Sequence, residues 1–168
     1  MTPNESAAAV DSIDREIIEL LLRDGRLSNR AVADAVSIAE STCHARLRNL
    51  IEQGVIKSFH ACVDLAALGR PIQAVVFVRV RPQHRGQVVD EARRLVGADG
   101  VLDIIIVTGP YDLLVRVAVA SPAALQNFVF QELDASPAIV ATETHVMTDN
   151  YLGSMMSPAA PRSRRLPS

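Results

Sequence analysis

The first third of the chain carries its apolar residues at helical spacing and contains no strand-like run. Its first apolar positions recur at i, i+4, i+7 and i+8, on one face of a helix: Ile13, Ile17, Leu20 and Leu21. We expect Ser12 to cap the beginning of this helix and Gly25 to follow its end. Asp14 and Glu16 fall in the first turn, where the helix dipole favours acidic side chains.

Two further helices follow at close spacing. The second is expected to begin at Ser28 and to bury Ala31, Val32, Ala35 and Val36. The third is expected over residues 40–53, ends before Gly54, and has an apolar face made of Cys43, Leu47 and Leu50. Two helices joined by so short a turn cross steeply, and the first helix fills the angle between them. Residues 13–57 therefore predict a tri-helical helix-turn-helix, although an ordinary three-helix bundle fragment has the same pattern.

The second half mixes valine-rich strands with two helical patches. Strands are predicted at residues 72–80, 101–107, 113–119 and 139–147. Helices are predicted at residues 87–96 and 123–133, the second of them capped by Ser121. The order βαββαβ predicts a ferredoxin-like antiparallel sheet with both helices on one face, and hence an α+β fold. Because the other face of these apolar strands lacks a helical cover, we expect a second copy of the chain to bury it in a homodimer.

Composition and the pattern of apolar residues divide the chain into five segments. Residues 1–12 are small and polar and are expected to form a flexible arm. Residues 13–57 form the predicted helix-turn-helix, residues 58–70 a linker strand, and residues 71–152 the ferredoxin-like domain. Residues 153–168 contain three prolines, four serines and three arginines, a composition that buries little apolar surface and predicts a disordered tail.

Composition narrows the class of protein further. The chain has 168 residues, 49% of them apolar and 21% charged, which excludes collagen-like, disordered and disulfide-scaffold proteins. Its formal net charge of −2 gives no general attraction to nucleic acid. No apolar run approaches the roughly 20 residues of a spanning helix, and no signal core precedes Arg15. Cys43 and Cys62 lack CxxC spacing and are expected to be reduced thiols, so we expect a cytoplasmic protein without a membrane partner.

The residues and motifs that commonly form catalytic or metal sites give little support to the hypothesis that the protein is an enzyme. The four histidines are scattered and lack metal-ligand spacing: His44, His60, His84 and His145. The sequence has no glycine-rich phosphate loop and no Gly-x-Ser-x-Gly nucleophile elbow. The sequence alone does not exclude a catalytic Ser-His-Asp group assembled from residues that lie far apart in the chain. We therefore expect no metal, no cofactor and no enzymatic activity.

The predicted third helix presents a polar, arginine-bearing surface. With its apolar face turned inward, the other positions are Ser41, Thr42, His44, Ala45, Arg46, Arg48 and Asn49. Hydroxyl and amide groups contact phosphates and base edges, and arginine pairs with guanine or phosphate, so this surface suits a DNA major groove. The alternative is that Arg46 and Arg48 form a solvated helix face, that His44 has no role, and that Cys43 is a small core residue.

A series of short motifs extends over residues 13–152. They are Ile13-Asp14, Arg23-Asp24-Gly25-Arg26, Ser41-Thr42-Cys43, Arg46-Leu47, Leu50, Glu52-Gln53-Gly54-Val55-Ile56-Lys57 and Leu68-Gly69. In combination they resemble the leucine-responsive/asparagine-operon regulator (Lrp/AsnC) family of bacterial and archaeal transcription regulators. The resemblance implies an N-terminal helix-turn-helix of the winged type and a C-terminal βαββαβ domain for effector binding and dimerisation. It also implies dimers joined through open sheet faces and higher oligomers such as octamers.

Residues 108–112 match the family's Gly-x-Tyr-Asp signature. The resemblance implies that Gly109, Tyr111 and Asp112 contact a small effector, an amino acid. Glycine lets the backbone approach a carboxylate closely, and Asp112 supplies a negative partner for an ammonium group. The alternative is a turn between paired strands, with Tyr111 as a packed lid and Asp112 as a cap of the turn.

The sequence departs from the family pattern at the turn before the third helix. Ser37 stands where the family usually has glycine, and Ala39 where it usually has a serine N-cap. Ser37 and Glu40 have the spacing of a capping box, which predicts a helix that begins two residues earlier.

Together these features lead to one hypothesis and two alternatives. The hypothesis is a sequence-specific transcription regulator that binds double-stranded DNA and whose oligomer responds to an amino-acid effector. The first alternative is an architectural DNA-binding protein with weak sequence preference, and the second is a small ferredoxin-like enzyme. The basic tail adds, at most, non-specific attraction to phosphates.

Overall fold

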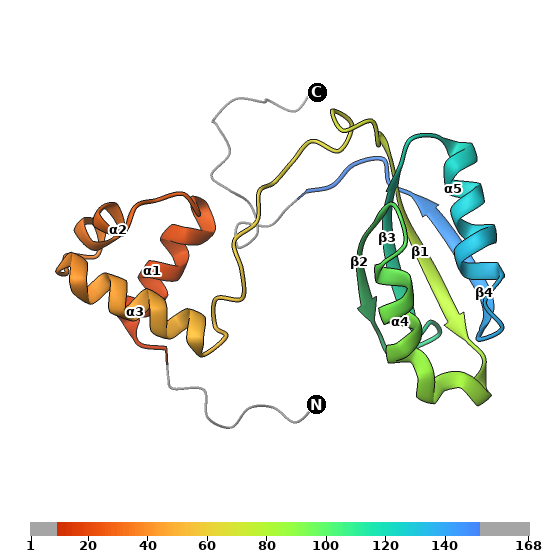
Figure 1. Ribbon diagram of the computed structural model, residues 1–168, viewed down its shortest axis with the longest axis horizontal. Helices are drawn as coiled ribbons and strands as arrows, with labels where there is room; N and C mark the ends of the chain where they lie inside the picture. Colours follow the sequence, from red (N-terminus) through yellow and green to blue (C-terminus); the bar gives the residue numbers. More distant parts are fainter. Residues whose placement is uncertain (1–9, 152–168) are drawn as a thin grey trace. The chain divides into compact units, whose positions relative to one another are not determined.

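The computed structural model describes residues 10–151, and their helices and strands form two compact units (Figure 1). The helical unit contains the described residues up to Cys62 together with Tyr151, and the sheet unit spans Val63–Asn150. Residues 1–9 of the predicted arm and the predicted tail at 153–168 lie outside the described residues. Each unit has its own hydrophobic core.

Three short helices make up the helical unit: α1 at Ser12–Arg23, α2 at Asn29–Ala35 and α3 at Glu40–Glu52. Asp11 rather than Ser12 caps α1, because the Asp11 carboxylate accepts a 2.8 Å hydrogen bond from the Asp14 N–H. The sequence predicts that the second helix begins at Ser28; it begins one residue later, and Ser28 is its cap, with its hydroxyl oxygen 3.2 Å from the Ala31 nitrogen. The tri-helical arrangement predicted from the sequence is therefore confirmed, with its first cap one residue earlier.

The turn between α2 and α3 differs from the sequence-based expectation. Ser37 has φ of +56°, the left-handed conformation that favours glycine, which explains why the family usually has glycine at this position. An N-cap residue must be extended, so Ser37 cannot open a capping box and that prediction is wrong. Ala39 is the extended residue before α3 and makes no side-chain cap. The Ile38 N–H instead closes the turn by donating to the Ala33 carbonyl oxygen at 3.0 Å.

The core of the helical unit has five buried residues: Ile17, Val32, Ala33, Cys43 and Leu50. In α2 the inward positions are Val32 and Ala33, whereas the expected core residues Ala31 and Ala35 are exposed. The buried face of α2 is therefore rotated from the predicted one, because the packing of α1 and α3 rather than the local periodicity decides which side of a seven-residue helix turns inward. Cys43 is a buried core residue, and burial raises the pKa of its thiol.

The sheet unit contains β1 at Ile72–Val80, β2 at Val101–Ile106, β3 at Leu113–Val119 and β4 at Ile139–Val146. All pairs are antiparallel, in the order β2-β3-β1-β4. Helices α4 at Val88–Val96 and α5 at Pro122–Phe128 lie on one face of the sheet (Figure 1). This is the ferredoxin-like arrangement predicted from the βαββαβ order.

Alternation along the central strands separates the two faces of this sheet. Val76 and Val78 of β1 and Val115 and Val117 of β3 are fully buried against the helices, where Leu95 of α4 joins them. The residues between them belong to the other face, which we call the open face. In the middle of the two central strands it carries Val75, Phe77, Leu114 and Arg116, which are all half-buried.

Three segments depart from the predicted elements. Val129–Asp134 continues α5 as a π-helical turn, so the expected single helix changes its winding near its middle. Pro82–Gln87 forms a 3₁₀ turn before α4. Residues 57–64 form no strand, so the expected linker strand is absent from this part of the described chain, because no neighbouring strand offers hydrogen-bond partners to it.

Within residues 10–151 no helix is long and apolar enough to cross a membrane. The same residues contain no group of three or more His, Cys, Asp or Glu side chains that could hold a metal ion. Cys43 and Cys62 are both free, the first buried and the second exposed.

Candidate DNA-binding helix and effector loop

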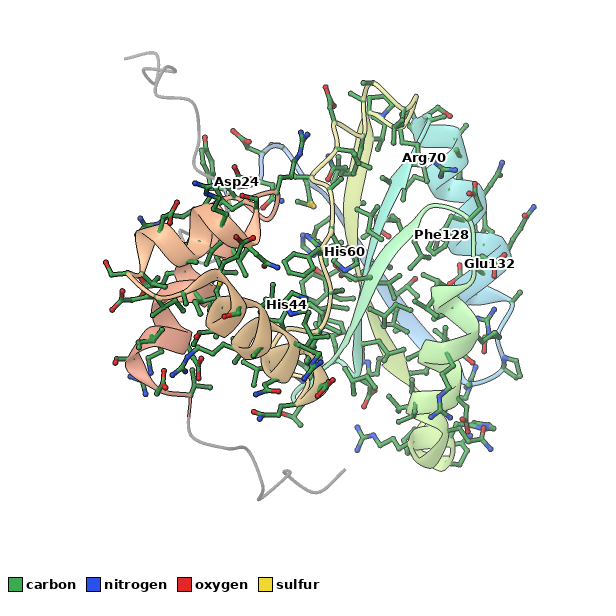
Figure 2. All side chains as sticks on the ribbon, turned by 60° about the vertical axis from the view of Figure 1, so that its left-hand side comes forward. Asp24, His44, His60, Arg70, Phe128 and Glu132 are labelled. Carbon is green, nitrogen blue, oxygen red and sulfur yellow. The ribbon has the colours of Figure 1, made fainter. Side chains whose placement is uncertain are left out.

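Helix α3 turns a largely polar surface outward because its apolar side chains, apart from Ala45 and the 46% exposed Ile51 near its end, are turned toward the core. Cys43 and Leu50 are buried and Leu47 is half-buried. Between Glu40 and Leu50 the exposed residues are Ser41, Thr42, His44, Ala45, Arg48 and Asn49, and Figure 2 labels His44 among them. Five of the six DNA-binding candidates therefore share an exposed helix surface. The sixth, Arg46, has a different environment.

Arg46 points back to the beginning of α1. Its Nη1 lies 2.7 Å from Asp11 Oδ2 and 2.9 Å from Asp14 Oδ1, and its side chain is 29% exposed. The Asp14 N–H and the Arg46 guanidinium hold the pKa of the Asp11 carboxyl below its ordinary value. We call this group the Arg46 clamp. It ties the middle of α3 to the first turn of α1, so it fixes the direction in which α3 presents its exposed residues.

Arg48 makes only a weak ion pair. Its Nε lies 3.6 Å from Glu52 Oε1, one turn along the same helix, and both side chains are about two-thirds exposed. Exposed pairs at this spacing contribute little to stability and are screened by salt. The Arg48 guanidinium is therefore able to exchange Glu52 for a phosphate or a base edge.

The loop between β2 and β3 carries the effector candidates Gly109, Tyr111 and Asp112. Gly109 has φ of +134° and is exposed, and a Cβ atom at this position would meet nothing within 4 Å. Asp112 is held at the end of β1: its Oδ2 accepts a 2.8 Å hydrogen bond from the Val80 N–H, and its own N–H donates to the Val78 oxygen at 2.9 Å. Its Oδ1 lies 3.6 Å from Arg85 Nε. The carboxylate thus anchors the loop to β1 and faces a cation.

Tyr111 lies over the open face of the sheet. Its hydroxyl donates to Glu143 Oε2, and its ring centroid is 5.1 Å from that of Phe77. His145 packs edge-on against Phe77 with the ring centroids 5.1 Å apart, and its Nε2 lies 2.8 Å from Glu143 Oε1. The bond to Glu143 raises the pKa of Tyr111, and Tyr111 and His145 together lower the pKa of Glu143. Tyr111 and Asp112 therefore contact different residues of β1: Tyr111 contacts Phe77, and Asp112 is bonded to Val78 and Val80.

Sequence reasoning missed the polar side chains that accompany these candidates. Arg116 of β3 pairs with Asp103 of β2, with Nε 2.9 Å from Oδ1 on the open face. Glu143 and His145 alternate with threonines on β4, a pattern that places both on one face and could have indicated their proximity. Asp11 offers no such signal, because its bond to Arg46 joins residues 35 positions apart.

The sequence matches two protein families. Residues 10–57 match the family described as winged helix-turn-helix DNA-binding, and residues 73–156 match the Lrp/AsnC ligand binding domain. A similar protein is the HTH-type transcriptional regulator AldR from Mycobacterium tuberculosis, which is 34% identical over 146 residues, 87% of this chain and 82% of AldR.

Solved structures agree with this match. The crystal structure of AldR from Mycobacterium tuberculosis has a TM-score of 0.79 and 35% identity, and covers 88% of this chain and 97% of its own. The transcriptional regulator NMB0573 from Neisseria meningitidis, solved as a complex with L-Met, has a TM-score of 0.78. It covers 90% of this chain and 98% of its own, but at 21% identity it supports the fold alone.

Fold and matches together define a class of protein that joins a DNA-binding helix-turn-helix to a ligand-binding ferredoxin-like domain. The chain belongs to the Lrp/AsnC family of transcriptional regulators. Its relatives are named as regulators of transcription rather than as enzymes.

Proposed function

We propose that α3 is the recognition helix of this regulator and enters the major groove of double-stranded DNA. Ser41, Thr42, His44, Arg48 and Asn49 contact phosphates and base edges, while Arg46 positions the helix through the Arg46 clamp. The observation that carries this proposal is the exposed polar surface of α3 opposite buried Cys43 and Leu50. Such a regulator acts in the cytoplasm, where the DNA lies.

We also propose that the regulator is a homodimer joined through the open face of the sheet, and that dimers assemble into a higher oligomer such as an octamer. The support is the apolar content of a face that no helix covers: Phe77 is half-buried and Ile105 is 49% exposed in the single chain. Two-fold assembly places two recognition helices on one duplex, which offsets the weak charge of a single unit.

For the effector we propose an amino acid bound at the loop of Gly109, Tyr111 and Asp112. The open space over Gly109 leaves backbone N–H groups accessible to a carboxylate. Asp112 supplies a negative partner for the ammonium group, and neighbouring Arg85 adds a cation for the carboxylate. The related NMB0573 was solved with L-Met, which is consistent with an amino acid as the ligand class.

One experiment tests the regulator function as a whole. Genome-wide binding of the protein is measured at one fixed salt concentration, without and with each candidate amino acid, because phosphate contacts depend steeply on salt. The proposal predicts a limited set of sites that share a sequence and whose occupancy changes with one or a few amino acids. Uniform binding along the genome contradicts sequence-specific regulation and supports the architectural alternative. Binding that no amino acid changes contradicts the effector assignment.

A further inference from the structure

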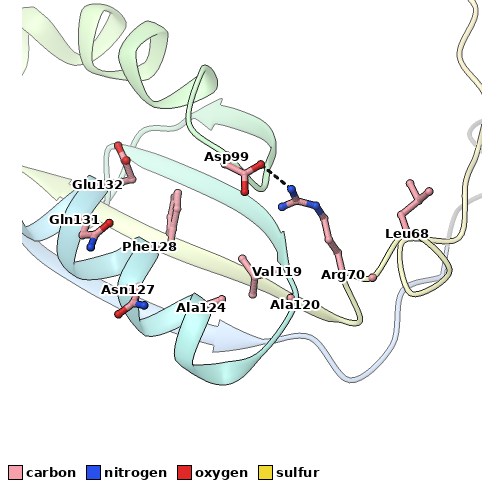
Figure 3. Close-up of a pocket in the computed structure, with 11 residues that line it drawn as sticks. Leu68, Arg70, Asp99, Val119, Ala120, Ala124, Asn127, Phe128, Gln131 and Glu132 are labelled. Carbon is pink, nitrogen blue, oxygen red and sulfur yellow. Dashed lines mark hydrogen bonds and ion pairs between the residues drawn. The ribbon is translucent and has the colours of Figure 1, made fainter.

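Figure 3 shows a cavity of about 420 Å³ lined by Arg70, Val119 and Phe128. It lies at the end of the sheet opposite to the Gly109 loop. The loop precedes the first residue of β3, whereas the cavity lies at the last residue of β3, Val119, and at α5. Its charged lining residues come from three separate segments: Arg70 before β1, Asp99 before β2 and Glu132 after α5. None of the assigned or proposed functions uses this cavity.

Arg70 is fixed at one side of the cavity. Its Nη1 donates to the Ala118 carbonyl oxygen at 3.1 Å and its Nη2 to Asp99 Oδ1 at 2.6 Å. The close approach depends on Gly100, which has φ of +86°. A Cβ atom at Gly100 would lie 2.9 Å from the Ala118 oxygen and 3.1 Å from Arg70 Nη1. The structure therefore holds a guanidinium and a carboxylate next to each other at the cavity mouth, with Asp99 88% exposed to a ligand.

An apolar floor separates this pair from a second carboxylate. Val119 and Phe128 are almost fully buried and form the floor together with Ala124. In Figure 3 Phe128 lies between Arg70 on one side and Glu132 on the other. Glu132 is 38% exposed; Arg94 donates to its carboxylate at 3.3 Å and to its carbonyl oxygen at 2.5 Å. One end of the cavity therefore presents the Arg70 guanidinium and the Asp99 carboxylate, its middle is apolar, and its other end presents the Glu132 carboxylate.

We propose that this cavity binds a free basic α-amino acid such as lysine, as a second ligand site distinct from the Gly109 loop. The α-carboxylate of the ligand pairs with Arg70 and its α-ammonium with Asp99. Its methylene chain covers Val119 and Phe128, and its side-chain cation reaches Glu132. Two acidic residues and one arginine line the site, which complements a ligand with two positive groups and one negative group.

Calorimetry on the full chain at fixed salt tests the ligand chemistry. L-Lysine is compared with L-norleucine, which lacks the side-chain ammonium, and with cadaverine, which lacks the carboxylate. We expect lysine to bind and each analogue to bind about tenfold more weakly or worse, because norleucine forms no ion pair with Glu132 and cadaverine forms none with Arg70. Absence of lysine binding at millimolar concentration overturns the proposal, and so does equal binding of norleucine.

Three substitutions test the location. Glu132→Gln is expected to weaken lysine about tenfold while leaving norleucine unchanged, and Asp99→Asn to weaken both ligands. Asp90→Asn is the matched control, because Asp90 is a similarly exposed, arginine-paired carboxylate on α4 outside the cavity. Lysine affinity that survives both cavity substitutions overturns the assignment. Loss of lysine binding in Asp112→Asn, with both cavity variants unaffected, places the ligand at the Gly109 loop and also overturns it.

Discussion

The two units of this protein are stabilised in different ways. The sheet unit has twelve buried residues in its core and a four-stranded ladder of backbone hydrogen bonds. The helical unit has five buried residues and relies in addition on polar groups at helix ends, namely the Asp11 and Ser28 caps and the Arg46 clamp. Because burial of apolar area supplies most folding free energy, the DNA-binding unit has the smaller reserve of stability. DNA binding is therefore more vulnerable to substitution than the fold of the ligand-binding unit.

The largest effect on the stability of the helical unit is expected from Ile17→Ala. Ile17 is fully buried in the small core, and such truncations cost about 2–5 kcal/mol, which is most of the stability of so small a unit. Amide hydrogen exchange should show loss of protection in α1 to α3 with the strands still protected, together with loss of DNA binding. Leu22→Ala, at a 37% exposed position on the same helix, is the control. Equal loss of protection in both units contradicts the difference drawn between them.

Arg48→Ala is expected to weaken DNA binding about tenfold and to reduce the slope of log affinity against log salt by about one. Its melting temperature should stay unchanged, because the Arg48–Glu52 pair is exposed and long. Arg93→Ala is the matched control: this arginine of α4 is also exposed and paired within its helix. An unchanged gel-shift titration for Arg48→Ala removes that residue from the DNA contact.

Asp112→Asn tests the effector loop without breaking its anchor. The amide oxygen still accepts the Val80 N–H, but the negative charge is removed. From a panel of amino acids other than lysine, the one that binds the wild-type chain best should bind this variant about tenfold more weakly, while DNA binding without effector is retained. If calorimetry finds the same affinity, the Asp112 carboxylate does not hold the ammonium group.

Arg46→Ala should reduce DNA affinity less than Arg48→Ala and by a different route. The melting temperature of the helical unit falls because the Arg46 clamp is lost, but the salt slope stays unchanged because Arg46 contacts α1 rather than phosphate. Asp14→Asn, which weakens the same clamp, should change DNA affinity in the same direction. A reduced salt slope with an unchanged melting temperature would show that Arg46 binds DNA directly.

The smallest expected effect is a loss of stability of the helical unit at low pH. The Asp14 N–H and Arg46 lower the pKa of Asp11 below its ordinary value of 3.8, so Asp11 contributes stability that is present above that value. This contribution is lost as the pH falls further and the folded-state carboxyl becomes protonated. Thermal unfolding followed by circular dichroism should therefore show a drop for the wild-type helical unit below about pH 4. Asp11→Asn, which keeps a capping oxygen, should flatten that drop, and an equal drop in the variant contradicts the assignment.

Much of the fold follows from local sequence patterns. Alternation of apolar residues predicts the bounds of β1 and β3 as the structure has them, serine before a helix predicts the cap Ser121, and the beginning of α2 is predicted to within one residue. Local patterns do not predict which face a residue occupies where the pairing register of two strands shifts. Simple alternation groups Ile139 with Ala141, but a register shift between β1 and β4 pairs Ile139 with Val80 and turns it into the core.

By itself the sequence determined the order of helices and strands, the apolar faces and the class of regulator, because periodicity and caps act within a few residues of each other. The tertiary structure alone decided which charges meet. It brought Arg46 to Asp11 and Asp14, sent Tyr111 to Glu143, and joined Arg70 to Asp99 at the cavity. These pairs lie 29 to 35 positions apart, and a charged side chain has no periodicity that encodes its partner. Its contacts depend on how the packed elements place the backbone.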